Sequence, residues 1–337
     1  MKRFSFIFIL VICICSSYAQ KSDFKHISLK KADSIAFNYK DESLHNLPIL
    51  SYKLTHNLST DVEKFRAIYK WVCIAIANDY SLWDLNQSKR NRFENKSEKL
   101  KIWNIKIKEK LYNRLLNDKR TICSGYAFLI KELCDLANLE TKVIHGFGKT
   151  AYTTLNETSS PNHSWNSVLL NNKWYLVDAT WASGSQNPTT YNFEFNYSDG
   201  YFLTHPKLFA TNHYPIDSKW QLIAPETFTF DSFLKAPIFY RDGFEILEQT
   251  NYPTKFHTNI NLEQKASFSY LFSKELKTEE LQFLLDDGKS SKLINPELVE
   301  TNSHIKMNYK FPKTGFYDVH LMYKTTFLAT YTYNVVP

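Results

Sequence analysis

Three short motifs between residues 121 and 181 decide the fold: TICSGYA at 121–127, NHSWN at 162–166 and WYLVDATW at 174–181. After the first motif, apolar side chains recur every three or four positions from Ala127 to Ala137, which predicts a helix. Cys123 then lies at the N-terminus of this helix. The unpaired N–H groups and the positive end of the helix dipole favour a thiolate at such a position. Cys123 is therefore a candidate nucleophile.

Gly125 lies in the first turn of the same predicted helix. A glycine inside a helix costs roughly 1 kcal/mol relative to alanine. This cost is explained if another group must come close to the backbone, and a substrate carbonyl is one candidate. Gly125 is therefore a candidate substrate-binding residue.

The second and third motifs predict two antiparallel strands. β-branched and aromatic residues follow His163, and NNK at 171–173 indicates a tight turn into WYLVD. With the turn centred on Asn171 and Asn172, residues that face each other have numbers that add up to about 343, the sum of 171 and 172. Asp178 then faces Trp165, and His163 lies one or two positions further out.

A thiol, an imidazole and a carboxylate together form a known catalytic arrangement. The imidazole takes the proton of the thiol, and the carboxylate fixes the imidazole tautomer and stabilises the imidazolium. We predict that Cys123, His163 and Asp178 form a catalytic triad. Trp165 lies next to this histidine motif and is predicted to shape the substrate pocket.

The three motifs resemble the transglutaminase-like superfamily, in its kyphoscoliosis-peptidase-like branch. The similarity extends to EKFRAIYKWV at 63–72 and to YFLTHPKLF and KWQL between 201 and 222, so it covers about residues 50–225. The resemblance implies a papain-like fold and acyl transfer through the triad Cys123, His163 and Asp178. His205 departs from the pattern, because the branch usually has an acid after Leu-Thr, and this puts a role for that acid in doubt.

The length and the strand pattern predict an α+β fold with two domains, since 337 residues exceed what one small core needs. We place a transglutaminase-like catalytic domain at residues 20–224 and a second domain at residues 225–337. Apolar residues alternate near the C-terminus at 305–311, 317–323 and 331–335. Such short strands indicate an all-β, immunoglobulin-like sandwich.

The region before the nucleophile contains one clear helix. Thr60 and Glu63 form a capping box, and a wide apolar stripe follows from 65 to 76, which is expected to pack behind the nucleophile helix. Residues 21–58 are expected to wrap around the domain. Residues 78–120 are polar and rich in lysine, and we expect them to form a long loop that borders the cleft.

Other histidines are interpreted as structural. His145 is a competing base, but no Trp-Asn pair follows it as it follows His163. His205 and His213 lie in HPK and HYP, which suggest turns, and no cysteine or acid has metal-ligand spacing to them. We therefore predict neither a metal nor a cofactor.

Three cysteines remain after residue 19: Cys73, Cys123 and Cys134. This number does not form a disulfide framework. We expect Cys73 and Cys134 to be buried free thiols, and a disulfide between them is the alternative.

Residues 1–19 are predicted to be a signal peptide. Two basic residues precede an apolar run at 4–15, and Ser17 and Ala19 suit signal peptidase. The run is too short for a stable membrane anchor, and no other stretch predicts one. Lipidation at Cys13 or Cys15 is an alternative that the preceding isoleucines disfavour. The protein is therefore expected to be periplasmic, at the cell surface or extracellular.

A sequon supports this location. Asn162 starts one of six Asn-x-Ser/Thr sequons, and a glycan on it would crowd the neighbouring His163. We therefore favour a host that does not glycosylate these sites.

The formal charge of +7 falls to +5 when the two basic residues of the signal peptide are removed. Basic residues cluster at 89–120, but Glu94, Glu98 and Glu109 interrupt them and few aromatic residues lie among them. This pattern favours a solvated face and argues against nucleic acid as a partner.

The sequence thus predicts an exported cysteine-dependent acyl-transfer enzyme with a protein or peptide substrate. With water as acceptor it is a peptidase or amidase, and with an amine it is a transglutaminase. We favour hydrolysis because water is the default acceptor. The alternative is a catalytically inert transglutaminase-like scaffold that binds partners in the cell envelope.

Overall fold

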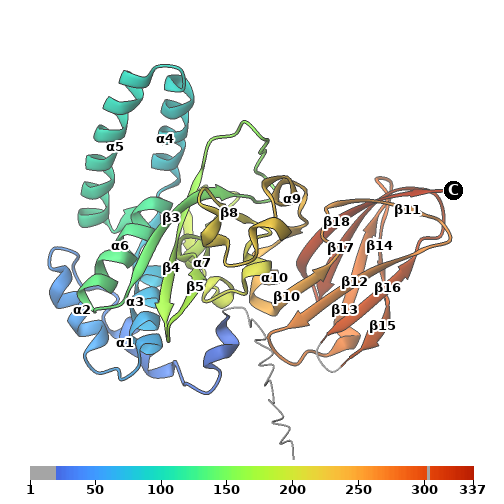
Figure 1. Ribbon diagram of the computed structural model, residues 1–337, viewed down its shortest axis with the longest axis horizontal. Coiled ribbons are helices and arrows are strands. Elements are labelled where there is room, and N and C mark those ends of the chain that lie inside the picture. Colours follow the sequence, from blue (N-terminus) through green and yellow to red (C-terminus); the bar gives the residue numbers. More distant parts are fainter. Residues whose placement is uncertain (1–19, 302–303) are drawn as a thin grey trace, which may run out of the picture.

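The computed structural model describes residues 20–301 and 304–337 and has the predicted α+β architecture. The predicted signal peptide, residues 1–19, lies outside the described residues. Figure 1 shows helices and a small sheet in the N-terminal part of the chain, followed by a strand-rich C-terminal part. In the described ranges, no helix combines the length and the apolar character that crossing a membrane requires.

The N-terminal part consists of helices around an antiparallel sheet of order β5-β4-β3-β8. Its helices are α1 (Lys30–Asn38), α2 (Leu47–Thr55), α3 (Asp61–Ala75), α4 (Tyr80–Phe93), α5 (Ser97–Asp118), α6 (Cys123–Leu136), α7 (Ala179–Ser183) and α8 (Pro206–Phe209). Its strands are β1 (Ala77–Asn78), β2 (Arg120–Thr121), β3 (Thr141–Gly148), β4 (His163–Leu170), β5 (Lys173–Val177), β6 (Gly184–Gln186), β7 (Phe193–Phe195) and β8 (His213–Pro215).

The hairpin of β4 and β5 has the predicted register. Asn166 pairs with Val177, and the two numbers add up to 343. Asn171 and Asn172 both have positive φ, 49° and 61°, as a two-residue type I′ turn requires. Asparagine tolerates this conformation better than most residues do. The turn therefore sets the register that brings the second and third motifs side by side.

Helix α3 begins and packs as predicted. The Thr60 hydroxyl accepts a hydrogen bond from the N–H of Glu63 at 3.3 Å, and the Glu63 carboxylate accepts one from the N–H of Thr60 at 3.0 Å. The helix contacts α6, and Cys73 is fully buried between them and α7.

Two segments differ from the predictions. Residues 21–58 contain α1 and α2, which contact α3. Residues 78–120 form the helical hairpin of α4 and α5 where we predicted a loop, and it projects from the body of the protein in Figure 1. Leu82 and Ile107 are the residues of α4 and α5 that are buried. With so little buried surface, the hairpin has no wide apolar stripe for a sequence reading to detect.

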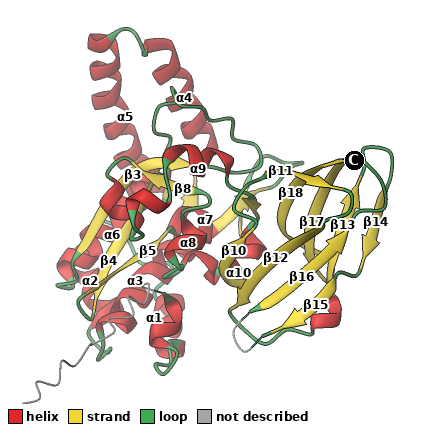
Figure 2. Ribbon diagram, turned by 45° about the vertical axis from the view of Figure 1, so that its right-hand side comes forward, coloured by secondary structure: helices red, strands yellow, loops and turns green. Residues whose placement is uncertain are grey.

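The C-terminal part starts with α9 (Phe230–Lys235), β9 (Ile238–Phe239) and α10 (Arg241–Ile246), and two sheets follow (Figure 2). One sheet has the order β10-β12-β16-β15, and the other has the order β11-β18-β17-β13-β14 with β9 beside β18. The strands are β10 (Leu247–Tyr252), β11 (His257–Asn261), β12 (Lys265–Phe272), β13 (Leu281–Asp286), β14 (Ser291–Ile294), β15 (Glu297–Glu300), β16 (Ile305–Lys310), β17 (Gly315–Tyr323) and β18 (Thr326–Val336).

The two sheets share an aromatic core. Phe268 of β12 lies 4.6 Å from Phe283 of β13 and 5.2 Å from Tyr331 of β18, measured between ring centroids. The strand-rich character of this part is confirmed, but it is not all-β, because α9 and α10 precede the sheets. The strand order is compatible with an immunoglobulin-like sandwich. That assignment and the domain boundary at 224/225 stay predictions.

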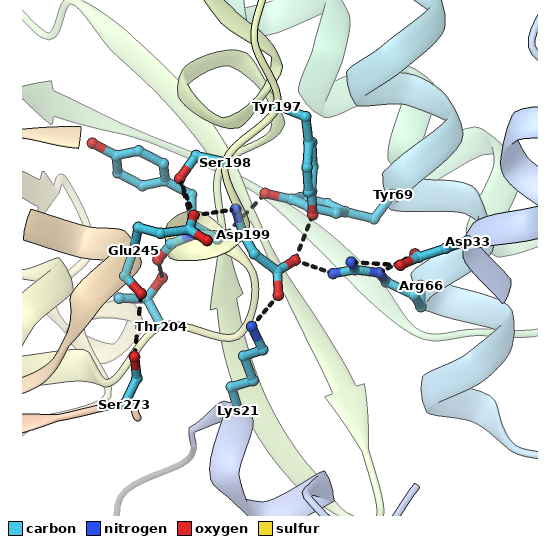
Figure 3. A network of polar contacts seen from close by, with 12 residues as sticks. Lys21, Asp33, Arg66, Tyr69, Tyr197, Ser198, Asp199, Thr204, Glu245 and Ser273 are labelled. Atoms are coloured by element: carbon cyan, nitrogen blue, oxygen red, sulfur yellow. Dashed lines mark hydrogen bonds and ion pairs between the residues drawn. The ribbon is translucent and has the colours of Figure 1, made fainter. Parts of the chain in front are cut away.

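A buried ion-pair network joins the N-terminal helices to the loop before η2 (Asp199–Tyr201) (Figure 3). Arg66 of α3 is buried and pairs with Asp33 of α1, with 2.6 Å between Nε and Oδ1, and also with Asp199. Lys21 and the Tyr197 hydroxyl contact the same Asp199 carboxylate. Burial alone would raise the pKa of Asp199, but Arg66 and Lys21 outweigh it and hold that pKa well below its usual value.

The same network reaches the predicted triad. Tyr69, one turn after Arg66, is fully buried, and its hydroxyl donates to the backbone carbonyls of Asp178 at 3.1 Å and Tyr201 at 3.0 Å. Glu245 of α10 accepts from the Ser198 hydroxyl at 2.7 Å, as Figure 3 shows. Helix α3 thus fixes the backbone at Asp178 from behind.

We expect Arg66→Ala to lower the free energy of unfolding by roughly 1–3 kcal/mol, because it removes a buried guanidinium from two partly exposed carboxylates. Lys64→Ala on the same helix is the matched control. It removes an exposed pair with Asp61, at 3.2 Å, and should cost at most about 1 kcal/mol. Urea denaturation followed by circular dichroism measures both, and equal losses would contradict a buried network.

Candidate active site

Cys123 is the first residue of α6, as predicted. Strand β2 ends one residue before the N-cap of this helix and the cap is Ile122, so only Ile122 separates β2 from Cys123; β2 pairs in parallel with β1, which follows α3. This pairing fixes the chain directly before the thiol. Cys123 is only 8% exposed and lines a cleft of about 840 Å³. The thiol is therefore nearly buried but open to the cleft on one side.

His163 connects the thiol to the carboxylate. It is the first residue of β4, and its Nε2 lies 2.6 Å from Oδ2 of Asp178. The Cys123 side chain interacts with the same imidazole and contributes to the raised pKa of His163. The indole of Trp181 stacks on the imidazole, with the ring centroids 4.6 Å apart. The ring is thus held at Nε2 and on one face.

The charge of Asp178 controls the protonation of His163. Burial alone would lower the pKa of His163, but the Asp178 carboxylate and the hydrogen bonds to Asp178 and Cys123 outweigh it and raise the pKa above its usual value. In return, the imidazole holds the pKa of Asp178 well below its usual value, against the opposing effect of burial. The structure therefore favours an imidazolium beside a carboxylate.

Asp178 is fully buried and has a partner for each oxygen. Its Oδ1 caps α7 by accepting from the backbone N–H groups of Thr180 at 2.8 Å and Trp181 at 3.1 Å. Its Oδ2 contacts both His163 and His213. The aspartate of the third motif is therefore a helix cap as well as the partner of the imidazole.

His213 belongs to the site, and the interpretation of this residue as part of a turn is wrong. It is fully buried in β8, and its Nε2 lies 3.0 Å from Oδ2 of Asp178. Its ring stacks on Phe209 at 3.8 Å between centroids. No motif signals it, because β8 reaches the site by pairing with β3 far along the chain. His205, in contrast, caps α8, as a turn residue would.

His163, Asp178 and His213 also form a group that could hold a metal ion, since one ligand atom from each lies within 4.8 Å of the others. Both imidazoles, however, direct Nε2 at the same carboxylate oxygen, at 2.6 and 3.0 Å. A cation would have to replace these two hydrogen bonds. The geometry is therefore that of a hydrogen-bonded cluster.

The two predicted substrate contacts have other roles. Trp165 is 1% exposed and packs behind the imidazole against Phe209 and His213, so the prediction that it shapes the pocket is wrong. Gly125 does line the cleft, but the group that needs its missing side chain is Thr121. A Cβ on Gly125 would lie 1.9 Å from the Thr121 hydroxyl oxygen.

The remaining candidates are structural. The Nδ1 of His145 lies 2.9 Å from the Ser164 hydroxyl, and burial lowers the pKa of His145. Cys73 and Cys134 are free and buried, so the alternative of a disulfide between them is wrong. Burial raises the pKa of the Cys134 thiol to about 12. Cys123 is the one cysteine of the described residues that lines the cleft.

We expect His163 to be protonated at pH 7.5 and to become neutral in Asp178→Asn, because burial is then no longer opposed by a carboxylate. Nitrogen-15 NMR of the imidazole measures this directly. His145 is the internal control, since its lowered pKa keeps it neutral in both proteins.

The same pKa shift makes the stability depend on pH. Because the pKa of His163 is raised in the folded protein, the contribution of its charged form to the free energy of unfolding is complete below the unfolded pKa of about 6.5 and declines as the pH rises toward the folded pKa. A neutral His163 in the unmutated protein would contradict the ion pair.

Comparisons with known proteins match the segment that contains these residues. Residues 49–179 match the family model of the transglutaminase-like superfamily. Kyphoscoliosis peptidase of Homo sapiens is 34% identical over 174 residues, which cover 51% of this chain and 23% of that protein. Hillarin of Drosophila melanogaster is 24% identical over 240 residues, which cover 66% of this chain and 27% of that protein. The match with each of these curated relatives thus covers about a quarter of the relative's own length.

A solved structure titled "Crystal structure of a TGase" aligns with 57% of this chain and 40% of its own, at 17% sequence identity. Its TM-score of 0.27 is too low to carry an argument about the fold. The segment that matches the family model begins in α2 and ends one residue after Asp178, so it contains Cys123 and His163. Residues 49–179 therefore form a transglutaminase-like domain, and this part of the chain is similar to kyphoscoliosis peptidase.

Proposed function

We propose that this protein is a cysteine-dependent acyl-transfer enzyme that acts on amide bonds of proteins or peptides. The observation that carries the proposal is that Cys123 and His163 line the same cleft while Nε2 of His163 lies 2.6 Å from Oδ2 of the buried Asp178. The superfamily assignment supports it, because a Cys, His, Asp triad is typical of these proteins. The catalytic role of Cys123 is part of the proposal.

The first half of the reaction forms a thioester. Cys123 Sγ, with its proton held by His163, attacks the amide carbonyl carbon, and the carbonyl electron pair moves to oxygen. When this tetrahedral species collapses, the C–N bond breaks and His163 gives the proton to the leaving amine. The acyl group then remains on the sulfur of Cys123.

The second half regenerates the thiol. Water or an amine adds to the thioester carbonyl and loses a proton to His163. The C–S bond then breaks, and the proton returns to the sulfur. Asp178 keeps the imidazole oriented and stabilises its charged form throughout. We assign the backbone N–H of Cys123 as a donor to the oxyanion, because the first N–H groups of a helix lack acceptors within that helix.

We favour water as the acceptor, which makes the protein a peptidase or amidase. The name kyphoscoliosis peptidase, which the human and mouse relatives carry, supports cleavage, and the superfamily name supports transfer to an amine. Mass spectrometry of proteins incubated with the active enzyme and with Cys123→Ala separates the two. New N-termini indicate hydrolysis, and isopeptide links indicate transamidation.

We expect Cys123→Ala and His163→Ala each to lower turnover about a thousandfold or more, since members of a triad act as a unit. Cys134→Ala is the matched control, because it removes a buried thiol from the same helix and should retain turnover. Cleavage of labelled casein and incorporation of a fluorescent amine into casein measure the two reactions. Equal turnover in Cys123→Ala would end the proposal.

Alkylation tests the same site without a substrate. Iodoacetamide should modify Cys123 in the native protein and leave the buried Cys73 and Cys134 unmodified, as peptide mapping would show. The reaction at Cys123 should slow in His163→Ala. An unreactive Cys123 would favour an inert scaffold.

We also propose that the protein is exported and that residues 1–19 are removed, because Lys2, Arg3 and the apolar run that follows have the composition of a signal peptide. The mature chain is then expected to begin at Gln20. N-terminal sequencing of protein from the cell envelope or medium measures this. A retained Met1, or a lipid on Cys13 or Cys15, would contradict it.

A further inference from the structure

The charged side chains that line the cleft beside Cys123 are all positive. Besides the His163 imidazolium, its charged lining residues are Arg90 of α4 and Lys108 of α5, and no Asp or Glu lines it in the described part of the chain. Neither cation forms an ion pair with a described carboxylate, and Arg90 donates a hydrogen bond to the amide oxygen of Asn104 at 3.4 Å. His145, also in the cleft, adds little positive charge because burial lowers its pKa. The two cations are therefore available to an anionic group in the cleft.

The helical hairpin adds to this positive field. Residues 80–118 contain ten Lys or Arg and five Asp or Glu, a net charge of +5 of the +7 of the whole chain. The hairpin that contributes one side of the cleft thus carries most of the excess positive charge of the protein, and two of its ten cations line the cleft. Such a field attracts anionic segments and repels cationic ones, within about 10 Å at ordinary ionic strength.

The cleft also exposes large apolar side chains. Trp83 is 39% exposed, Tyr112 62%, Phe128 49% and Ile216 62%, and all four line the cleft. They come from α4, α5, α6 and the segment after β8. Water-exposed apolar side chains that gather in one concave site indicate a binding surface.

The lining residues of α5 show which part of the cleft is cationic and which part is apolar. On α5, Asn104, Lys108, Leu111 and Leu115 recur at intervals of three and four residues, so they share one face of the helix. Leu115 lies near the end of α5, from which β2 leads to Cys123, and Asn104 lies further out beside Arg90. The cationic residues therefore lie outward of the apolar surface, and the thiol lies at its inner end.

We propose that the cleft selects peptide segments in which a large apolar residue is followed or preceded, within a few positions, by an acidic residue. The apolar side chain fits the surface of Trp83, Tyr112 and Phe128, and the carboxylate pairs with Arg90 and Lys108. Amide side chains of the hairpin, such as Asn86 and Gln87, line the path between them and suit an extended peptide backbone. This inference rests on the proposed function, because it names the substrate of the same thiol.

The test uses the full chain with Cys123→Ala, so that binding is measured without turnover. The probes are fluorescein-labelled nine-residue peptides with a central Phe and with two Glu, two Gln or two Lys residues three and four positions away. Fluorescence anisotropy should give the Glu peptide a dissociation constant about tenfold lower than that of the Gln peptide, and the Lys peptide should bind most weakly. Replacing the Phe by Ala should weaken all three.

Matched variants locate the effect. Arg90→Gln with Lys108→Gln should reduce the preference for Glu over Gln to less than about twofold. Lys99→Gln with Lys101→Gln changes the charge of α5 by the same amount outside the cleft lining and should retain the preference. Equal binding of the Glu and Gln peptides, or equal loss in both double variants, would overturn the inference.

The outcome also separates this inference from the proposed function. Selective binding by Cys123→Ala with no turnover by the unmutated protein would refute the enzyme and keep the acidic-peptide site. Turnover that is indifferent to the acidic residue would keep the enzyme and refute the site.

Discussion

The buried carboxylate of Asp178 is the group on which the rest of the site depends. Its two oxygens accept four hydrogen bonds, from the N–H groups of Thr180 and Trp181 and from the rings of His163 and His213. A charge in the protein interior is tolerated only when its hydrogen-bonding capacity is met. Here the donors come from α7, β4 and β8. The fold of these three elements and the ionisation of one carboxylate are therefore coupled.

This coupling explains why an aspartate stands at position 178. Asparagine caps helices as well as aspartate does, so capping α7 alone does not require a charge. A carboxylate at position 178, unlike an amide, raises the pKa of His163 against the cost of burying the charged imidazole. Tyr69 fixes the backbone of the same residue through its carbonyl. Asp178 thus follows the last residue of β5, caps α7 and supplies the negative charge of the site.

Local signals in the sequence were sufficient for much of this arrangement. Asn171 and Asn172 determine a turn type, the turn determines the register of the hairpin, and the register brings the imidazole motif beside the carboxylate motif. The start of α6 at Cys123 follows from apolar periodicity in the same way. These features depend on residues close together in the chain, which is why a sequence reading finds them.

The features that the sequence did not reveal depend on distant contacts. His213 reaches Asp178 only because β8 pairs with β3, and nothing near it in the chain marks that pairing. Trp165 is a large aromatic residue close to His163 in the sequence, as a pocket residue could be, but Phe209 and His213 pack against it and enclose it. The sequence did not predict the two helices of the α4–α5 hairpin, because each of them has a single buried residue and therefore no apolar stripe.

The pairing of β1 with β2 has a consequence for how such a protein can diversify. Ala77 pairs with Arg120 and Asn78 with Thr121, so the chain leaves and re-enters the body of the protein at neighbouring points. The segment between these points can change in length and composition while the ladder keeps the entry to α6 in place. The hairpin is therefore an exchangeable module, and grafting a different one at these two junctions would change the wall of the cleft while Cys123, His163 and Asp178 keep their places.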